Sequence, residues 1–173
     1  MSLQFRDLKA EEIDVRIGQV KPNGVVLLLY KDARCDMNIL DETVGVLNWE
    51  REHYECKGNL FCKVGINVNY DKNDGIPFWV YKADCGTESF TEKEKGESSD
   101  SFKRACVNFG IGRELYTAPF IWVDSSKCTI RDKKCYDKFV VEKVVIKDKR
   151  ITALAIKNAT LNTRVFVWQE VAK

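Results

Sequence analysis

Alternation of apolar and polar side chains is clearest in the middle of the chain, where it predicts three consecutive β-strands. Residues 49–56 alternate, residues 57–59 form a turn, and residues 60–68 alternate again. A second turn at residues 71–75 precedes a third alternating stretch at residues 78–83. Period-two alternation is typical of strands with one buried face, and connections this short make consecutive strands neighbours. We therefore expect a three-strand antiparallel meander.

The stretch before the meander is predicted to contain two helices and one strand. Residues 8–18 are expected to form a short helix that ends in a turn at residues 21–24. The apolar run at residues 25–30 is expected to form a buried strand. Asp36 is a suitable N-cap for a second helix, which has its apolar residues on one face and is expected to end near Asn48.

A third helix is predicted directly after the meander. The segment from Thr91 to Glu94 has the capping-box form, in which the threonine hydroxyl and the glutamate carboxylate each accept from a backbone amide. Gly110 and Gly112 are expected to end this helix. Apolar residues at positions i, i+3, i+4 and i+7 form the face that is expected to pack on the sheet: Phe102, Ala105, Cys106 and Phe109.

Beyond this helix, residues 115–123 are expected to be extended, and residues 139–146, 151–156 and 165–168 to form strands. A length of 173 residues is close to that of one domain, so we predict a single domain over residues 1–173. The predicted class is α+β. An antiparallel β-meander is packed by a helix (a β-β-β-α core), with a helix and strand before it and a small β segment at the C-terminal end.

Charge is nearly balanced over the chain but uneven along it. Lys and Arg number 28 against 26 Asp and Glu, which excludes an overall polycation. Residues 127–150 hold nine Lys and Arg against four acids, and we expect this segment to face solvent rather than to line a groove. No stretch of about 18 apolar residues and no signal-peptide pattern is found, so a soluble, cytoplasmic protein without a membrane partner is expected.

Seven cysteines do not form a metal-binding pattern. There is no C-x-x-C pair and only one histidine, His53, whereas a structural zinc site usually draws four ligands from closely spaced pairs. Reduced cysteines packed as small core residues are the favoured interpretation. His53 and Cys56 lie an odd number of positions apart in a predicted strand, so they face opposite sides and do not form a nucleophilic pair.

The third predicted helix carries the candidate phosphate-binding cations. At 100° per residue, Arg104 lies nearly opposite the centre of the apolar face and Lys103 about a quarter-turn to one side, with Lys95 two turns earlier. Adjacent fixed cations can hold phosphate oxygens by charge-assisted hydrogen bonds. The alternative is an ordinary solvated helix face, because four acids on the same helix balance these charges: Glu92, Glu94, Glu97 and Asp100.

The loop from Asp84 to Ser89 is a weaker candidate. Asp84 and Glu88 could contribute carboxylates to a Mg²⁺ site, but the sequence offers no further oxygen ligands that can be placed there. The simpler interpretation is that Gly86 serves a turn and that the two acids act as caps or ion-pair partners. We expect no resident metal or cofactor. The sequence also lacks the G-x-x-x-x-G-K-[ST] motif of ATP-dependent recombinases.

A longer pattern resembles a known family. Lys82 to Ser89 reads K-A-D-C-G-T-E-S and leads into T-E-K-E-K-G-E-S-S-D-S-F-K-R-A-C-V-N-F-G-I-G-R-E-L-Y. This resembles the Rad52/Rad22 family of single-strand annealing proteins, in particular its short phage and prophage members. The spaced residues upstream also match: Tyr30, Asn38, Glu42, Gly45 and Trp49. The resemblance covers residues 24–122 as a Rad52-like core, and residues 123–173 match only as a short β-rich extension.

The resemblance implies a protein that is not an enzyme. It would bind single-stranded DNA, assemble into an oligomeric ring, and anneal complementary strands in recombination and double-strand break repair without ATP. A single-strand-binding protein or an exonuclease would be possible partners, and the location would be the bacterial or phage-infected host cytoplasm. Two other functions remain open: a metal-dependent nuclease or nuclease accessory that uses Asp84 and Glu88, and a structural homologue that does not bind DNA.

The DNA-binding residues that the resemblance implies are carried over one by one. Lys103 and Arg104 fall on the family's paired basic residues, and Lys95 on another lysine associated with DNA binding. Cys35 and Val107 stand where relatives have basic residues. The resemblance therefore implies a less cationic groove, or one that draws on two other arginines: Arg34 and Arg113.

Overall fold

The computed structural model describes residues 3–72, 75–87 and 93–171. The chain forms two compact units that interleave in sequence. The first unit comprises Met1–Arg6 and Ala33–Gly112, and the second comprises Asp7–Asp32 and Arg113–Lys173. The single domain over residues 1–173, with a core at 24–122 and an extension at 123–173, stays a prediction.

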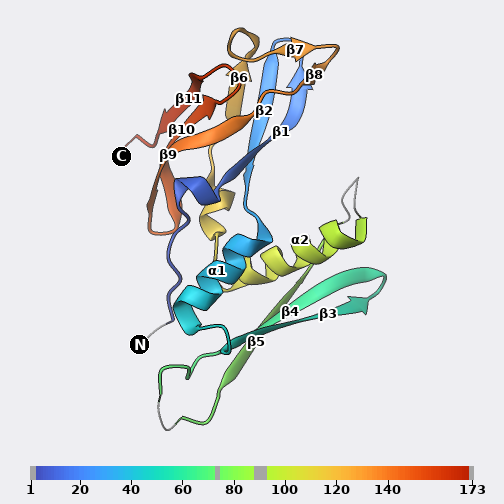
Figure 1. The fold of residues 1–173 in the computed structure, drawn as a ribbon, viewed down its shortest axis with the longest axis vertical. Helices are drawn as coiled ribbons and strands as arrows, with labels where there is room; N and C mark the ends of the chain where they lie inside the picture. The colour runs from blue at the N-terminus through green and yellow to red at the C-terminus, as the bar shows by residue number, and fades with distance from the viewer. Residues whose placement is uncertain (1–2, 73–74, 88–92, 172–173) are drawn as a thin grey trace. The chain divides into compact units, whose positions relative to one another are not determined.

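The first unit contains the predicted meander and two helices (Figure 1). Strand β3 pairs with β4 and β4 with β5, both antiparallel, so the predicted three-strand order is confirmed. Helix α2 ends at Asn108, as its spacing predicted, and its predicted capping box at Thr91 lies outside the described residues. The elements are α1 (Ala33–Val44), β3 (Trp49–Cys56), β4 (Asn59–Asn67), β5 (Trp79–Cys85) and α2 (Lys93–Asn108).

Helix α2 lies across one face of this sheet (Figure 1). The sheet contributes alternate residues of β4 to the shared core, and the helix contributes the face that its apolar spacing predicted. On β3, the Trp49 ring packs against the Phe102 ring with their centroids 6.0 Å apart. This core is fully excluded from solvent at Cys62, Val64, Ile66, Phe102, Ala105 and Cys106.

The second unit is built mainly from a six-stranded antiparallel sheet in the order β11-β10-β9-β1-β2-β6. The sheet curls, because Cα atoms of its two outer strands, β11 and β6, approach within 8 Å. A small hairpin, β7–β8, projects from the same unit (Figure 1). The elements are η1 (Ala10–Glu12), β1 (Asp14–Lys21), β2 (Gly24–Tyr30), η2 (Arg113–Thr117), β6 (Ile121–Asp124), η3 (Ser125–Lys127), β7 (Ile130–Arg131), β8 (Lys134–Cys135), β9 (Phe139–Lys147), β10 (Arg150–Asn158) and β11 (Thr163–Gln169).

The helix predicted for residues 8–18 is wrong. Only Ala10–Glu12 form a 3₁₀ turn, and residues 14–18 belong to β1, which pairs along its length with β2. Ile13, Val15 and Ile17 are each less exposed than the residues between them, as in a strand. The acids before these residues favour a helix, but pairing with β2 determines the conformation. The predicted strands at 25–30 and in the C-terminal segment are confirmed.

Two further boundaries differ from the predictions. Helix α1 begins at Ala33 rather than after Asp36, which lies inside the helix and is fully buried. It ends at Val44 because Gly45 takes a positive φ of 84°, a conformation that glycine adopts without steric cost. Residues 115–123 are only partly extended, since a 3₁₀ turn precedes the short strand β6.

Candidate nucleic-acid interface

The first half of α2 is held against the meander by a close backbone approach and by two side-chain carboxylates. A Cβ atom on Gly86 would lie 2.2 Å from the Glu97 carbonyl oxygen, so glycine is required for this close approach. The Glu97 carboxylate accepts from the Leu60 amide at 3.1 Å. Asp100 accepts from the Thr87 amide at 3.1 Å and from its hydroxyl at 3.3 Å. Two of the acids that balance the helix cations in the sequence therefore hold α2 to the sheet.

The C-terminal end of α2 is held by hydrogen bonds to β5, an edge strand of the same sheet. Lys82 on β5 donates from Nζ to the Asn108 carbonyl oxygen at 2.6 Å, and the ammonium lies 5.0 Å from the Phe109 ring centroid. Asn108 donates from Nδ2 to the Ala83 carbonyl at 3.2 Å. A cation at a helix C-terminus offsets the negative end of the helix dipole. Lys82 on β5 is thus a further cation beside the C-terminal end of this helix, and sequence reasoning did not single it out.

Arg104 is held by an acid of the sheet. Its guanidinium lies 3.4 Å (Nε) and 3.3 Å (Nη2) from Oδ1 of Asp84 on β5, and the same oxygen accepts from the Cys85 amide at 2.8 Å. Charge-assisted hydrogen bonds are normally 2.7–2.9 Å long, so these contacts are weak. The Arg104 side chain is 42% exposed. The Arg104 side chain is therefore partly accessible to solvent although it contacts Asp84.

Lys103 is the least neutralised of the helix cations. It is partly exposed, and the described part of the chain contains no salt bridge or hydrogen bond of its ammonium. Lys95, two turns earlier on α2, is exposed. The structure therefore brings Lys95, Lys103 and Arg104 together on one helix, as their spacing predicted.

The two additional arginines belong to different parts of the fold. Arg34 is exposed on α1, which contacts α2 within the first unit. Arg113 is exposed at the start of η2 in the second unit. Cys35 is buried and Val107 is partly buried.

Of the two carboxylates suggested for a Mg²⁺ site, only one belongs to the described residues. Glu88 lies outside the described residues, and Asp84 is engaged by Arg104 and by the Cys85 amide. Within the described residues, no group of three or more His, Cys, Asp or Glu side chains could hold a metal ion.

The cysteines are free thiols, and four of the seven are buried. Burial raises the pKa of the Cys62 thiol to about 11, and burial together with the neighbouring Cys135 raises the pKa of Cys128 to about 11. His53 contacts α2 instead of a thiol, since its Nε2 lies 3.1 Å from the Ser98 hydroxyl. The prediction of reduced cysteines packed in cores is confirmed for the four buried thiols: Cys35, Cys62, Cys106 and Cys128.

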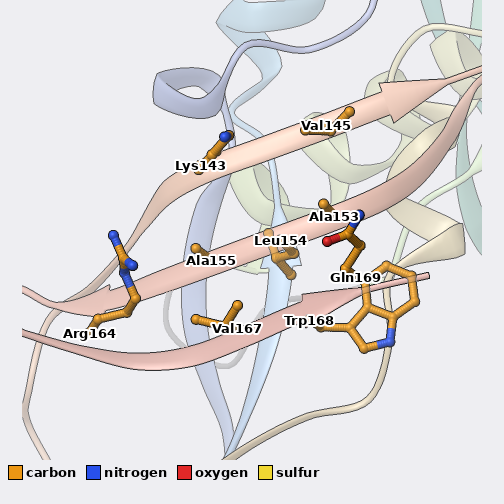
Figure 2. Close-up of a pocket in the computed structure, with 9 residues that line it drawn as sticks. All are labelled: Lys143, Val145, Ala153, Leu154, Ala155, Arg164, Val167, Trp168 and Gln169. Atoms are coloured by element: carbon orange, nitrogen blue, oxygen red, sulfur yellow. The ribbon is translucent and has the colours of Figure 1, made fainter. Parts of the chain in front are cut away.

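A shallow hollow lies on the second unit, over strands β9, β10 and β11 (Figure 2). The hollow forms because β10, the middle of these three strands, carries the short side chains of Ala153 and Ala155 between longer side chains on either side. Arg164 beside it forms an ion pair with Glu142. The lining residues are Lys143, Val145, Ala153, Leu154, Ala155, Arg164, Val167, Trp168 and Gln169. This hollow contains none of the predicted DNA-binding residues.

A family model described as "Rad52/22 family double-strand break repair protein" matches residues 5–134. No curated protein and no solved structure gave a significant match. Among the helices that the structure describes, none is long and apolar enough to cross a bilayer.

Proposed function

Since the chain belongs to the Rad52/22 family, whose members act in DNA recombination and double-strand break repair, we propose that it binds and anneals single-stranded DNA. Annealing would proceed without ATP or any cofactor, on an oligomeric ring of subunits with a Rad52-like core over residues 24–122. The contacts would come from α2 through Lys103, Arg104 and Lys95, joined by Arg34 and Arg113. We further propose a short phage or prophage type in the host cytoplasm, working with a single-strand-binding protein or an exonuclease.

The observation that supports this proposal most is the state of the two central cations. Lys103 is partly exposed and has no acid partner among the described residues, and the Arg104 side chain is 42% exposed with a long, weak contact to Asp84. Both can therefore exchange water or a weak partner for phosphate oxygens. Annealing needs this kind of contact, because a protein that binds the backbone leaves the base edges available to the complementary strand.

Oligomerisation would turn a weak site into a strong one. Lys103 and Arg104 together give only a few phosphate contacts per subunit, which is too few for tight binding at physiological salt. When the same cations repeat around a ring, one continuous strand meets all of them, and the second and later contacts become intramolecular. High-order assembly in solution is therefore expected, and sedimentation that finds only monomer at micromolar concentration, with and without an oligonucleotide, argues against it.

The test compares a double variant with a matched control. In Lys103→Ala with Arg104→Ala, two phosphate contacts per bound segment are lost, so the slope of log K against log salt falls by about 1.4 for single strands. The control, Lys57→Asn with Lys72→Ala, removes two exposed charges from turns of the same unit and should keep the slope. The annealing rate of complementary labelled oligonucleotides without ATP should fall only in the first variant. An unchanged slope in the folded double variant rejects α2 as the binding element.

A further inference from the structure

The hairpin β7–β8 in the second unit is a short two-strand projection. Ile130 pairs with Cys135 and Arg131 with Lys134, which leaves a two-residue turn at Asp132 and Lys133. Both turn residues have positive φ, 50° and 59°, as the tightest hairpin turns require. Such a turn matches the natural twist of the strands, so the positions of the side chains on the hairpin are well defined.

The two faces of this hairpin differ in character. Ile130 and Cys135 lie on one face and pack against the apolar core of the second unit. Arg131 and Lys134 lie on the opposite face, since side chains alternate along a strand. Tyr136 follows two residues after Lys134 and is 79% exposed. The core thus anchors a surface that presents two cations and an aromatic ring to solvent.

The positive charges on this surface repel one another. Arg131 and Lys134 are directly opposite in the ladder, an arrangement of like charges that destabilises a strand pair. No salt bridge in the described part of the chain involves Arg131, Lys133, Lys134 or Lys138, all of which are exposed.

The two nearby acids do little to relieve this repulsion. Asp137 is buried and accepts from the Thr129 amide at 2.7 Å and from Asn158 Nδ2 at 2.8 Å. Asp132 is the exposed acid of the turn and forms no salt bridge among the described residues. An external anion would therefore relieve a repulsion that the fold leaves in place.

We propose that this hairpin is a second contact surface for single-stranded DNA, a proposal that rests on the proposed function of the chain and extends it to the second unit. Arg131 and Lys134 would bind phosphates on either side of one nucleotide step. Tyr136 would stack on a base, as exposed aromatic residues do in proteins that bind single strands.

The charge distribution of the chain favours this assignment. The second unit carries 17 Lys and Arg against 12 Asp and Glu, whereas the first unit carries 11 against 14. The unit that holds the hairpin is therefore the one with excess positive charge, and a polyanion is the partner that fits it. Tyr136 adds an exposed ring on which a base can stack, so the polyanion proposed here is a nucleic acid with accessible bases.

The first experiment measures binding of fluorescein-labelled oligo-dT by the full chain over a range of salt concentrations. In Arg131→Ala with Lys134→Ala, we expect the salt slope to fall by about 1.4 while thermal stability stays equal or rises, because the cross-strand repulsion is removed. The matched control, Lys143→Ala with Lys147→Ala, removes two exposed lysines from β9 of the same unit. An equal fall in slope for control and hairpin variants would mean that only total charge matters, and would overturn the proposal.

The second experiment tests the tyrosine and the class of ligand. Tyr136→Ala should weaken oligo-dT binding at least fivefold with an unchanged salt slope, and Tyr136→Phe should bind like the original protein. If poly-glutamate of equal charge competes as well as unlabelled oligo-dT, and Tyr136→Ala binds normally, the hairpin is a general anion surface and the proposal fails. If Lys103→Ala weakens binding but the hairpin variants do not, the hairpin proposal alone fails. A full chain that binds no oligo-dT rejects the proposed function as well.

Discussion

Replacing Asp84 by asparagine should strengthen DNA binding, because Asp84 competes with phosphate for Arg104. The carboxylate lies 3.3 Å from the guanidinium, with side-chain exposures of 42% for Arg104 and 27% for Asp84. Exposed pairs of this kind contribute about 0.2–1 kcal/mol, so Asp84→Asn should cost no more than that in folding stability. Asparagine also keeps an oxygen that can accept from the Cys85 amide, as Asp84 does now.

The gain in affinity follows from Coulomb's law. A phosphate oxygen about 2.8 Å from the solvent side of the guanidinium would lie about 6 Å from the Asp84 carboxylate. In water this repulsion is about 0.7 kcal/mol, which corresponds to about a threefold change in the dissociation constant. Salt screens the interaction, so the gain should be largest near 50 mM salt and should disappear near 1 M.

Fluorescence anisotropy of labelled oligo-dT, titrated with the purified variant at several salt concentrations, measures this change. Asp71→Asn is the control, because it also removes one exposed carboxylate from the first unit but lies beyond the opposite end of β4. The control should bind like the original protein. If Asp84→Asn is folded and binds no more tightly than the control, Arg104 does not contact the strand and the site must be sought elsewhere.

Two substitutions and one chemical modification test the packing within the two units. Gly86→Ala places a methyl group 2.2 Å from a backbone oxygen of α2, so unfolding in urea should show a loss of about 1–3 kcal/mol, and an unchanged midpoint would contradict the contact. Glu114→Ala leaves the buried Leu8 amide without its acceptor at 2.8 Å and should cost about 1–3 kcal/mol, whereas Glu114→Gln should cost less; equal losses would show that the charge matters more than the hydrogen bond. Iodoacetamide at pH 8 should modify the exposed Cys56 in the native protein but not Cys62, whose burial raises the thiol pKa to about 11. Mass spectrometry that finds both modified at the same rate would contradict this packing.

The meander and α2 could be predicted from the sequence because their signals are local. Alternation over each strand, short turns between strands and one apolar helix face all agree with the final packing. Strand β1 shows the opposite case. Its alternation at Ile13, Val15 and Ile17 is present in the sequence, but Glu11 and Glu12 before it favour a helix, and only pairing with β2 decides between the two.

The candidate site was predictable in its residues but not in its contacts. The spacing placed Lys103 and Arg104 on one helix, and the family resemblance suggested a role for them. The ion pair of Arg104 with Asp84, 20 residues earlier, depends on how closely α2 packs on β5, which no local pattern specifies. The hairpin at residues 130–135 was missed because its strands are only two residues long, too short to show an alternating pattern.

The pairing of β2 with β6 has a consequence for how the protein is made. Gly24 of β2 pairs with Asp124 of β6, a separation of 100 residues, and the whole stretch from Ala33 to Gly112 is inserted between these two strands. During synthesis, the β1–β2 hairpin leaves the ribosome first but must wait for its neighbour until the inserted helices and meander have been translated. The inserted segment can complete its own core in that interval. The exposed apolar edge of β2 is then open to chaperones, or to pairing with other nascent chains, for about 5–20 s at ordinary translation rates of about 5–20 residues per second.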